Sequence, residues 1–269
     1  MSNFLRQMAE SSAARAAAVS RTFTSGDLDR PAYPLRLSGF DLIAEIKDRS
    51  PAEGELAAVN ADRQQRAARY VDGGAAAISV LTEPDRFDGA LSHLEEVVSA
   101  VSPDEVPVMR KDFLVDPVQV LEAKAAGASG ILLITAMLDD GILMNMLDSA
   151  FEHDLFVLLE SFDELDLERS VHVLQRVKYR EQAARRKFLI GVNTRDLRTL
   201  FVDPARLRNF APLLPEGVIS VAESGQHTAE DAANVAEWGY DMALVGTALM
   251  RSPEPAGLIR DMLGAGRGT

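Results

Sequence analysis

The stretch Leu42-Ile43-Ala44-Glu45-Ile46-Lys47 is an apolar run that ends on a lysine, directly before the turn-forming residues 49–54. A charged group at the C-terminal end of a buried strand is costly unless it is used, so Lys47 is a candidate for a functional site. The same pattern recurs at Val106-Pro107-Val108-Met109-Arg110-Lys111. Two such lysines in one chain predict two basic groups that converge on one ligand.

Around these two runs, apolar and β-branched segments alternate with helical segments along most of the 269 residues. The expected strands are residues 42–46, 76–81, 106–109, 130–135, 155–159, 188–192, 218–222 and 242–245. Helical patterns separate them, among them 62–73, 117–127 and 229–239, and several of these end on a glycine. Eight strand–helix units are typical of a closed parallel (β/α)8 barrel.

A doubly wound open sheet is the alternative fold for this alternation. Chemically interesting residues stand at the ends of many different runs, and a closed barrel brings all eight ends together. An open sheet gathers only the ends at its switch point. We therefore predict an α/β protein with a single (β/α)8 TIM-barrel domain over residues 1–269.

Two segments fall outside the strand–helix repeat. Residues 1–40 form an N-terminal helical extension, with an amphipathic helix over 3–19 and a polar connector, which caps the barrel bottom or flanks its mouth. Residues 161–187 form an enlarged charged segment, for which one long or two short solvated helices are expected.

Composition excludes several classes of function. The net charge of −13 argues against a nucleic-acid partner, and no window approaches a membrane span. The chain has no cysteine, and residues 1–20 lack the apolar core of a secretory signal, so we expect a cytoplasmic protein. In so acidic a chain, local lysines and arginines predict an anionic small-molecule ligand.

The strand ends carry most of the candidate chemistry: Glu45, Lys47, Lys111, Glu160, Asn193, Arg195, Glu223 and Ser224. Residues two apart in a strand share a face, so Glu45 and Lys47 are expected to point the same way. Facing carboxylates and ammonium groups shift each other's protonation, which allows acid–base catalysis without histidine. A structural ion-pair layer explains any single residue equally well, but it does not require so many desolvated charges at one end.

The last two strands end on small residues, Gly225 and Gly246, and Thr247 follows the second of them. A helix start after each strand would expose backbone N–H groups of the kind that hold phosphate in many barrels. Either glycine alone could serve only a tight turn, but the pair predicts a phosphorylated ligand. Metal-ligand spacings and a dinucleotide-binding fingerprint are absent from the sequence, so we expect no metal and no cofactor.

Together, these motifs resemble the indole-3-glycerol phosphate synthase family of tryptophan biosynthesis. The resemblance covers residues 4–250 and rests on motifs in family order: Ile43-Ala44-Glu45-Ile46-Lys47, Arg49-Ser50-Pro51, Ser79-Val80-Leu81-Thr82-Glu83, Phe87-Asp88-Gly89, Arg110-Lys111-Asp112-Phe113, Leu132-Leu133-Ile134, Leu159-Glu160, Gly191-Val192-Asn193, Arg195-Asp196-Leu197, Ala222-Glu223-Ser224-Gly225 and Leu244-Val245-Gly246.

The resemblance implies a lyase that closes the ring of 1-(2-carboxyphenylamino)-1-deoxyribulose 5-phosphate with loss of carbon dioxide and water. It implies that Lys111 is the general acid at the carbonyl and that Glu160 is the acid–base partner in the dehydration. Lys47 would contact the substrate anion and donate a proton in the second stage. The implied further catalytic residues are Glu45, Asn193 and Glu223. The implied substrate-binding residues are Ser50, Phe87, Phe113, Leu133, Arg195 and Ser224, and those for phosphate are Lys47, Gly225, Gly246 and Thr247.

The chain also departs from the family pattern. Ala52 and Glu53 replace a serine and a lysine, Ser161-Phe162 replaces Val-His, Thr194 stands for an Asn or Ser, and Gln226 for an Ile. These changes leave every expected acid and base in place. The expected effect is on substrate affinity and on the loop beside Lys47.

Three alternatives compete with this interpretation. A phosphoribosylanthranilate isomerase-like enzyme would use a cysteine, which the chain lacks. A Schiff-base aldolase most often carries its lysine on the sixth strand, where Asn193 stands. A non-enzymatic paralogue would bind a phosphosugar, or a partner protein through the 161–187 segment. For the intact protein we expect a monomer or a weak homodimer.

Overall fold

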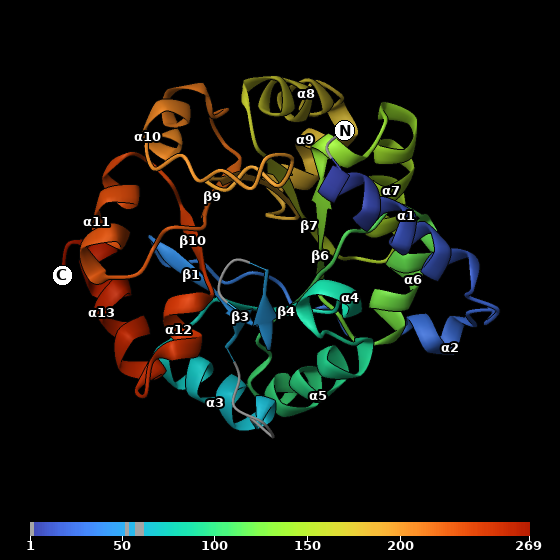
Figure 1. Ribbon diagram of the computed structural model, residues 1–269, viewed down its shortest axis with the longest axis horizontal. Helices are drawn as coiled ribbons and strands as arrows, with labels where there is room; N and C mark the ends of the chain where they lie inside the picture. The colour runs from blue at the N-terminus through green and yellow to red at the C-terminus, as the bar shows by residue number, and fades with distance from the viewer. Residues whose placement is uncertain (1–2, 52–53, 57–61) are drawn as a thin grey trace.

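The computed structural model describes residues 3–51, 54–56 and 62–269 (Figure 1). The departures at Ala52 and Glu53 lie outside these residues. Eight parallel strands close into a barrel in the order β1-β10-β9-β8-β7-β6-β5-β4. The predicted (β/α)8 barrel is thereby confirmed, and the open-sheet alternative is excluded.

Each of the eight expected runs overlaps one barrel strand. The strands are β1 (Asp41–Ile46), β4 (Ala77–Leu81), β5 (Val108–Lys111), β6 (Gly130–Ile134), β7 (Phe156–Ser161), β8 (Phe188–Asn193), β9 (Ile219–Glu223) and β10 (Met242–Val245). The largest difference is in β5, which starts two residues later than expected and includes Lys111. Pro107 lacks the N–H that a ladder position needs, so the strand begins after it.

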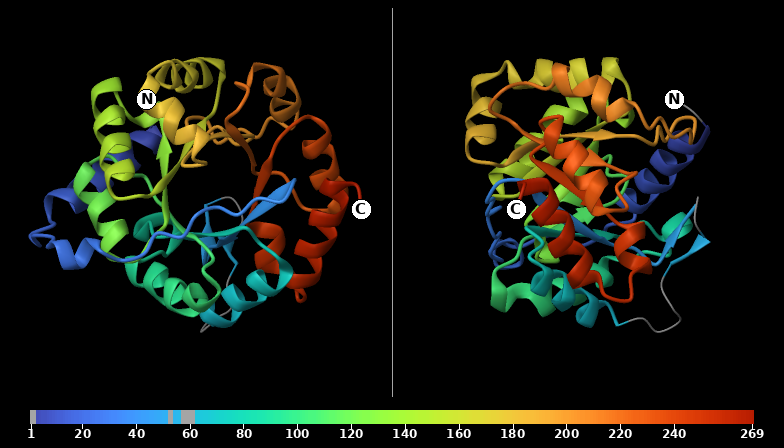
Figure 2. Two further views of the ribbon diagram at one scale, coloured as in Figure 1. Left: turned by 180° about the vertical axis from the view of Figure 1, so that it is seen from behind. Right: turned by 90° about the vertical axis from the view of Figure 1, so that its left-hand side faces the viewer.

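A ring of helices surrounds the barrel (Figures 1 and 2). Its α-helices are α3 (Arg63–Gly73), α4 (Pro84–Phe87), α5 (Leu91–Val101), α6 (Pro117–Ala125), α7 (Asp140–Glu152), α8 (Glu164–Leu174), α9 (Val177–Ala184), α10 (Arg206–Phe210), α11 (Ala229–Glu237), α12 (Thr247–Arg251) and α13 (Pro255–Arg267). Short 3-10 turns are η1 (Ser102–Asp104), η2 (Thr135–Met137) and η3 (Ala211–Leu213). None of the described helices is both long and apolar enough to cross a membrane.

Local sequence explains where these helices start. Before α6, the Asp116 side chain accepts a hydrogen bond from Val118 N, and the Gln119 side chain accepts one from Asp116 N. These bonds belong to a capping box, and a proline occupies the first turn of the helix. The helix therefore begins directly after the short loop that follows Lys111, the last residue of β5.

The N-terminal extension flanks the barrel mouth, one of its two expected positions. Its helix α1 (Asn3–Ala17) lies at the same end as the short antiparallel pair β2 (Arg49–Ser50) and β3 (Gly54–Glu55) (Figure 2, right). Gln119 Nε2 donates to Ser12 Oγ at 2.8 Å, and Arg15 Nη2 lies 2.7 Å from Asp112 Oδ1. The connector, with α2 (Ser25–Leu28), leads to the other end and β1 (Figure 2, left).

The 161–187 segment was expected to form one long or two short helices. It forms two short helices, α8 and α9. The expectation that they are solvated is wrong for one face of each. Leu167 and Val173 of α8 are buried, and Tyr179 of α9 packs against Phe151 and Phe188. Apolar residues at helical spacing thus dock both helices on the barrel, while most of the charged residues between them, with the exception of the buried Asp166, face outward.

One close contact fixes the packing inside the barrel. Gly130 on β6 pairs in register with Phe156 on β7, and a Cβ at Gly130 would overlap the Phe156 ring. The aromatic ring therefore fills the space that a side chain at position 130 would need.

We expect Gly130→Ala to lower the free energy of unfolding by about 1–3 kcal/mol, because overpacking a tight interior displaces neighbouring side chains. Urea unfolding followed by circular dichroism measures this change. The matched control is Gly257→Ala in α13, where a Cβ meets no atom of the described part of the chain within 4 Å. It is expected to preserve or raise stability by up to about 1 kcal/mol. Equal stability of the two variants would show that position 130 is not tightly packed.

Candidate active site

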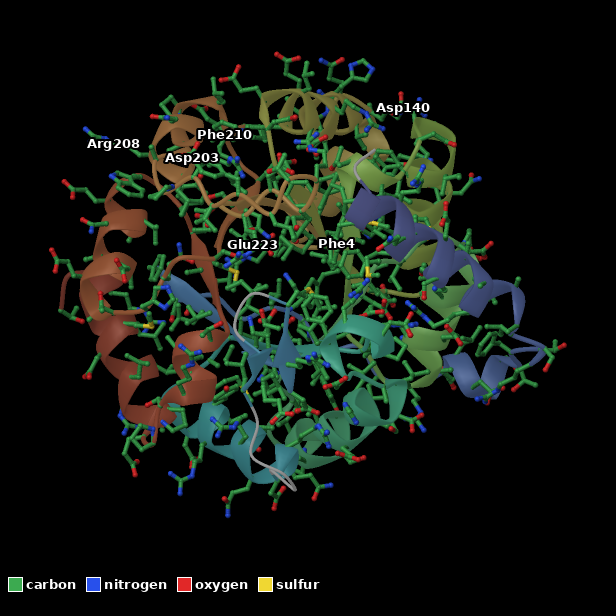
Figure 3. All side chains as sticks on the ribbon, in the orientation of Figure 1. Phe4, Asp140, Asp203, Arg208, Phe210 and Glu223 are labelled. Carbon is green, nitrogen blue, oxygen red and sulfur yellow. The ribbon has the colours of Figure 1, made fainter. Side chains whose placement is uncertain are left out.

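The carboxyl ends of the barrel strands surround one cavity of about 360 Å³. In Figure 3, Glu223 and Phe4 are labelled near the centre of the molecule, on opposite sides of this mouth. The expected residues that line the cavity are Glu45, Lys47, Ser50, Phe87, Lys111, Phe113, Glu160, Asn193, Arg195, Glu223, Ser224, Gly225, Gly246 and Thr247. The barrel therefore brings together residues that are far apart in the chain.

Lys111 lies among three carboxylates. Its Nζ is 2.9 Å from Glu223 Oε2, 3.6 Å from Glu160 Oε2 and 3.9 Å from Glu45 Oε2. Burial by itself would lower the pKa of Lys111, but the negative charges of the three glutamates outweigh it and raise the pKa well above its ordinary value. Lys111 is therefore an ammonium group, which donates hydrogen bonds.

Lys47 pairs with Glu45 at 2.7 Å, as expected for residues two apart on one strand face. Burial opposes ionisation of Glu45, yet the charges of Lys47 and Lys111 lower its pKa below the ordinary value. Gly246, directly after the neighbouring strand β10, makes room for this pair, because a Cβ there would overlap Glu45 Oε1. The requirement for glycine at position 246 is thus one of space beside an ion pair, since its φ of −119° needs no glycine.

Glu223 is buried, and its pKa is raised, first by burial and then by the negative charge of Glu160. Its Oε2 faces Lys111, while its Oε1 has no hydrogen-bond partner among the described residues. A Cβ at Gly191 on β8 would overlap Glu223 Oε1. No role of its own was expected for Gly191, although a glycine inside an apolar strand is a signal of close approach.

Asn193 connects Glu160 to the loop that follows β8. Its Nδ2 donates to Glu160 Oε1 at 3.1 Å, and its Oδ1 accepts from Arg195 N at 2.9 Å. The amide nitrogen can only donate and the amide oxygen can only accept, so these two partners fix the orientation of the Asn193 amide. Asn193 thus orients Glu160 and fixes the start of the loop that carries Arg195.

An apolar wall closes one side of the cavity. The ring centroids of Phe87 and Phe113 are 6.0 Å apart, and Phe4 of α1 packs on Phe113 at the same distance. The expected position of Leu133 is wrong: Leu132 and Ile134 line the cavity. Alternate residues of a strand face opposite sides, so Leu133 packs outward toward the helices. Phe4 was missed because its helix reaches the mouth only through tertiary packing.

The opposite side is polar and rich in backbone N–H groups. Ser224 and Gly225 are successive residues with positive φ, 64° and 88°, after β9. Gln226 Nε2 donates to Ser224 O at 2.7 Å and holds this turn, and Thr247 starts α12 across from it. Successive turns of this kind expose N–H groups that bind anions.

The raised pKa of Glu223 predicts a pH-dependent stability. The folded protein keeps a proton that the unfolded chain loses above its ordinary pKa of 4.5, so this group destabilises the fold as pH rises toward its folded pKa. Glu223→Gln should therefore gain stability relative to wild type between about pH 5 and pH 8, on the order of 1 kcal/mol per pH unit.

Urea midpoints at several pH values test this prediction, with the exposed Glu216→Gln as the control. The same pH dependence in wild type and Glu223→Gln would show that residue 223 is ionised in the folded state.

Comparison with known proteins identifies the family. The model of a family described as indole-3-glycerol phosphate synthase matches residues 35–262. A protein of that name from a Nocardioides species is 42% identical over 241 residues, which cover 88% of this chain and 86% of the relative. One from Mycobacterium leprae is 43% identical over 232 residues, with 86% and 79% covered.

Solved structures share the fold at low sequence identity. A phosphoribosyl anthranilate isomerase in complex with reduced 1-(o-carboxyphenylamino)-1-deoxyribulose 5-phosphate has a TM-score of 0.57 and 13% identity, covering 86% of this chain and all of that chain. The 3-hexulose-6-phosphate synthase of Salmonella typhimurium has a TM-score of 0.60 and 14% identity, with 82% and 96% covered. These likenesses support the barrel alone, whereas the match of sequence over most of the chain shows that it belongs to the indole-3-glycerol phosphate synthase family.

Proposed function

We propose that this protein converts 1-(2-carboxyphenylamino)-1-deoxyribulose 5-phosphate into indole-3-glycerol phosphate, carbon dioxide and water. Membership of the indole-3-glycerol phosphate synthase family supports this activity. The observation that carries it is the buried Lys111 ammonium, held by three glutamates beside an aromatic wall. This arrangement supplies a proton donor at a site where an aromatic ring attacks a carbonyl.

The two sides of the cavity match the two ends of this substrate. The carboxyphenyl ring lies against Phe87 and Phe113, and the phosphate lies at the turn of Ser224 and Gly225 near Thr247. Lys47 and Arg195 face the anionic groups from opposite sides of the mouth. Binding in this orientation places the substrate carbonyl at Lys111, between the ring and the phosphate.

In the first stage, the ring carbon that bears the carboxylate attacks the carbonyl carbon and forms the new carbon–carbon bond. Lys111 donates a proton to the carbonyl oxygen as negative charge develops there. The bond to the carboxylate then breaks, carbon dioxide leaves, and its electron pair restores the aromatic ring. Glu223, 2.9 Å from Lys111 Nζ and with a raised pKa, returns the proton to the lysine.

In the second stage, the new hydroxyl group leaves as water. Lys47 donates a proton to the departing oxygen, and Glu160 removes a proton from the adjacent carbon, so that the double bond of the indole forms. Asn193 holds Glu160 in place for this transfer through its 3.1 Å hydrogen bond. The apolar wall keeps bulk water away from the cationic intermediate.

The same observations separate this activity from its alternatives. An isomerase that depends on cysteine has no candidate residue in the chain. An aldolase lysine on the sixth barrel strand is replaced by Asn193 at the end of β8. A binding paralogue would need the cavity but not the proton donor, and its signature is ligand binding without turnover.

The remaining properties are part of the proposal. The substrate is a phosphorylated anionic small molecule, and neither nucleic acid nor membrane is a partner. The enzyme acts in the cytoplasm without a metal or cofactor, as a monomer or weak homodimer. The net charge of −13 supports the exclusion of nucleic acid, and the absence of cysteine supports the cytoplasmic location.

Turnover is tested by the rise of indole fluorescence when the purified protein receives 1-(2-carboxyphenylamino)-1-deoxyribulose 5-phosphate. We expect Lys111→Met to lower kcat by about 10²–10⁴-fold, because it removes the proton donor and keeps the side-chain volume.

The control is Lys178→Met on α9, whose ammonium pairs with Asp148 on the surface. It should turn over like wild type. Binding of the substrate by wild type without any fluorescence rise would exclude the enzymatic function and favour the binding paralogue.

A further inference from the structure

The loop after β8, residues 194–205, forms a large part of the cavity rim. Arg195, Leu197, Leu200 and Val202 all line the cavity. The loop is a tight hairpin, in which Arg195 pairs with Val202, and Leu200 N donates to Asp196 O at 2.7 Å. A substrate that fills the cavity must therefore contact this loop.

The hairpin does not hold this position through a core of its own. Leu200 has a φ of 62°, a conformation that is costly for a leucine, and it is 46% exposed. Its neighbour Phe201 is 66% exposed. At the base, the buried Arg206 donates to the carbonyl oxygens of Asn193 and Thr194. Local unfolding is easiest where buried contacts are few. The tip of the hairpin therefore keeps its position only if a second contact attaches it to the barrel.

Arg198 provides that attachment to the start of α8. Its Nη2 lies 2.6 Å from Asp163 Oδ2 and 3.4 Å from Asp166 Oδ2, and its Nε lies 3.1 Å from Asp196 Oδ1 within the hairpin. The guanidinium carbon is 5.7 Å from the centroid of the Phe162 ring. One side chain thus bridges the loop to three groups of the preceding strand–helix unit.

This bridge differs from an ordinary surface ion pair. The Arg198 side chain is only 25% exposed, and the side chains of Asp166 and Asp196 are 6% and 14% exposed, although that of Asp163 is 39% exposed. The Phe162 ring is fully buried. A guanidinium with several fixed partners in a partly shielded setting loses less to solvent and to side-chain freedom than an isolated exposed pair.

The bridge also completes a closed set of contacts between the ends of β7 and β8, which includes Glu160, the proposed acid–base residue. On the cavity side, Glu160 of β7 is bonded to Asn193, which is bonded to the backbone of Arg195. On the outer side, Arg198 returns to Phe162, two residues after Glu160. The two strand ends are therefore tied on both sides of the cavity wall.

We propose that Arg198 is a positioning residue, which clamps the 194–205 loop onto the start of α8 and so holds Arg195 and the Leu197–Leu200 wall against the substrate. Its kinetic consequence rests on the proposed function. Because the loop contacts the substrate before and during the reaction, loss of the clamp removes binding common to both states, which raises KM more than it lowers kcat.

The test compares Arg198→Ala, Arg198→Lys and the control Arg208→Ala, an exposed arginine on α10. We expect Arg198→Ala to raise KM about tenfold with kcat changed by less than about threefold. Arg198→Lys keeps the charge but not the fork, so its KM should fall between the other two. Arg208→Ala should match wild type.

Hydrogen–deuterium exchange gives a readout that does not depend on turnover. The amides of Asp196, Leu200 and Asp203 are bonded within the hairpin or to its base. In Arg198→Ala they should exchange at least about tenfold faster, while amides of β8 and α11 keep their wild-type rates.

Unchanged exchange in the loop, or a loss of kcat with unchanged KM, would overturn the clamp. Lack of turnover by wild type would refute the proposed function instead, and the exchange measurement would still decide whether Arg198 holds the loop.

Discussion

The burial of the Lys111 charge is the constraint on which the rest of the site depends. Moving an ion out of water costs several kcal/mol, and only close opposite charges offset that cost. Glu45 and Glu160 provide them, and Glu223 adds a hydrogen-bond partner, from three different strands. With Lys47 included, the group has two ammonium ions and three carboxyl groups, so a proton held by Glu223 makes it neutral. An anionic substrate then meets no net repulsion.

Space for these side chains comes from two glycines rather than from the width of the barrel. Gly191 leaves room for Glu223, and Gly246 leaves room for the pair of Glu45 and Lys47. Gly191 lies on β8, which pairs with the strand of Glu223. Gly246 directly follows β10, which pairs with the strand of Glu45. Because a barrel interior is packed with side chains, a layer of long charged residues needs small neighbours in the same layer. The charged side chains can therefore occupy their positions only because the residues packed beside them are glycines.

Much of this was predictable from the sequence, since the strands are short apolar runs and their last residues are polar. Position in a parallel strand determines which end of the barrel a residue reaches, so strand order alone places Lys47, Lys111, Glu160 and Glu223 together. The failures have a different origin. Leu133 was placed one residue off because a fully apolar strand gives no sign of which face is inward. Phe4 and Arg198 act through contacts between segments far apart in the chain, which sequence periodicity does not encode.

The junction of β1 with β10 has a consequence for biosynthesis. Ala44 pairs with Val245, so Glu45 and Gly246 become neighbours only when the last strand closes the barrel. The aromatic wall likewise needs Phe4, near the start of the chain, on Phe113. A nascent chain that still lacks β10 can carry every acid and base of the site but cannot enclose them. The site can therefore be completed only after β10 has been synthesised and has closed the barrel.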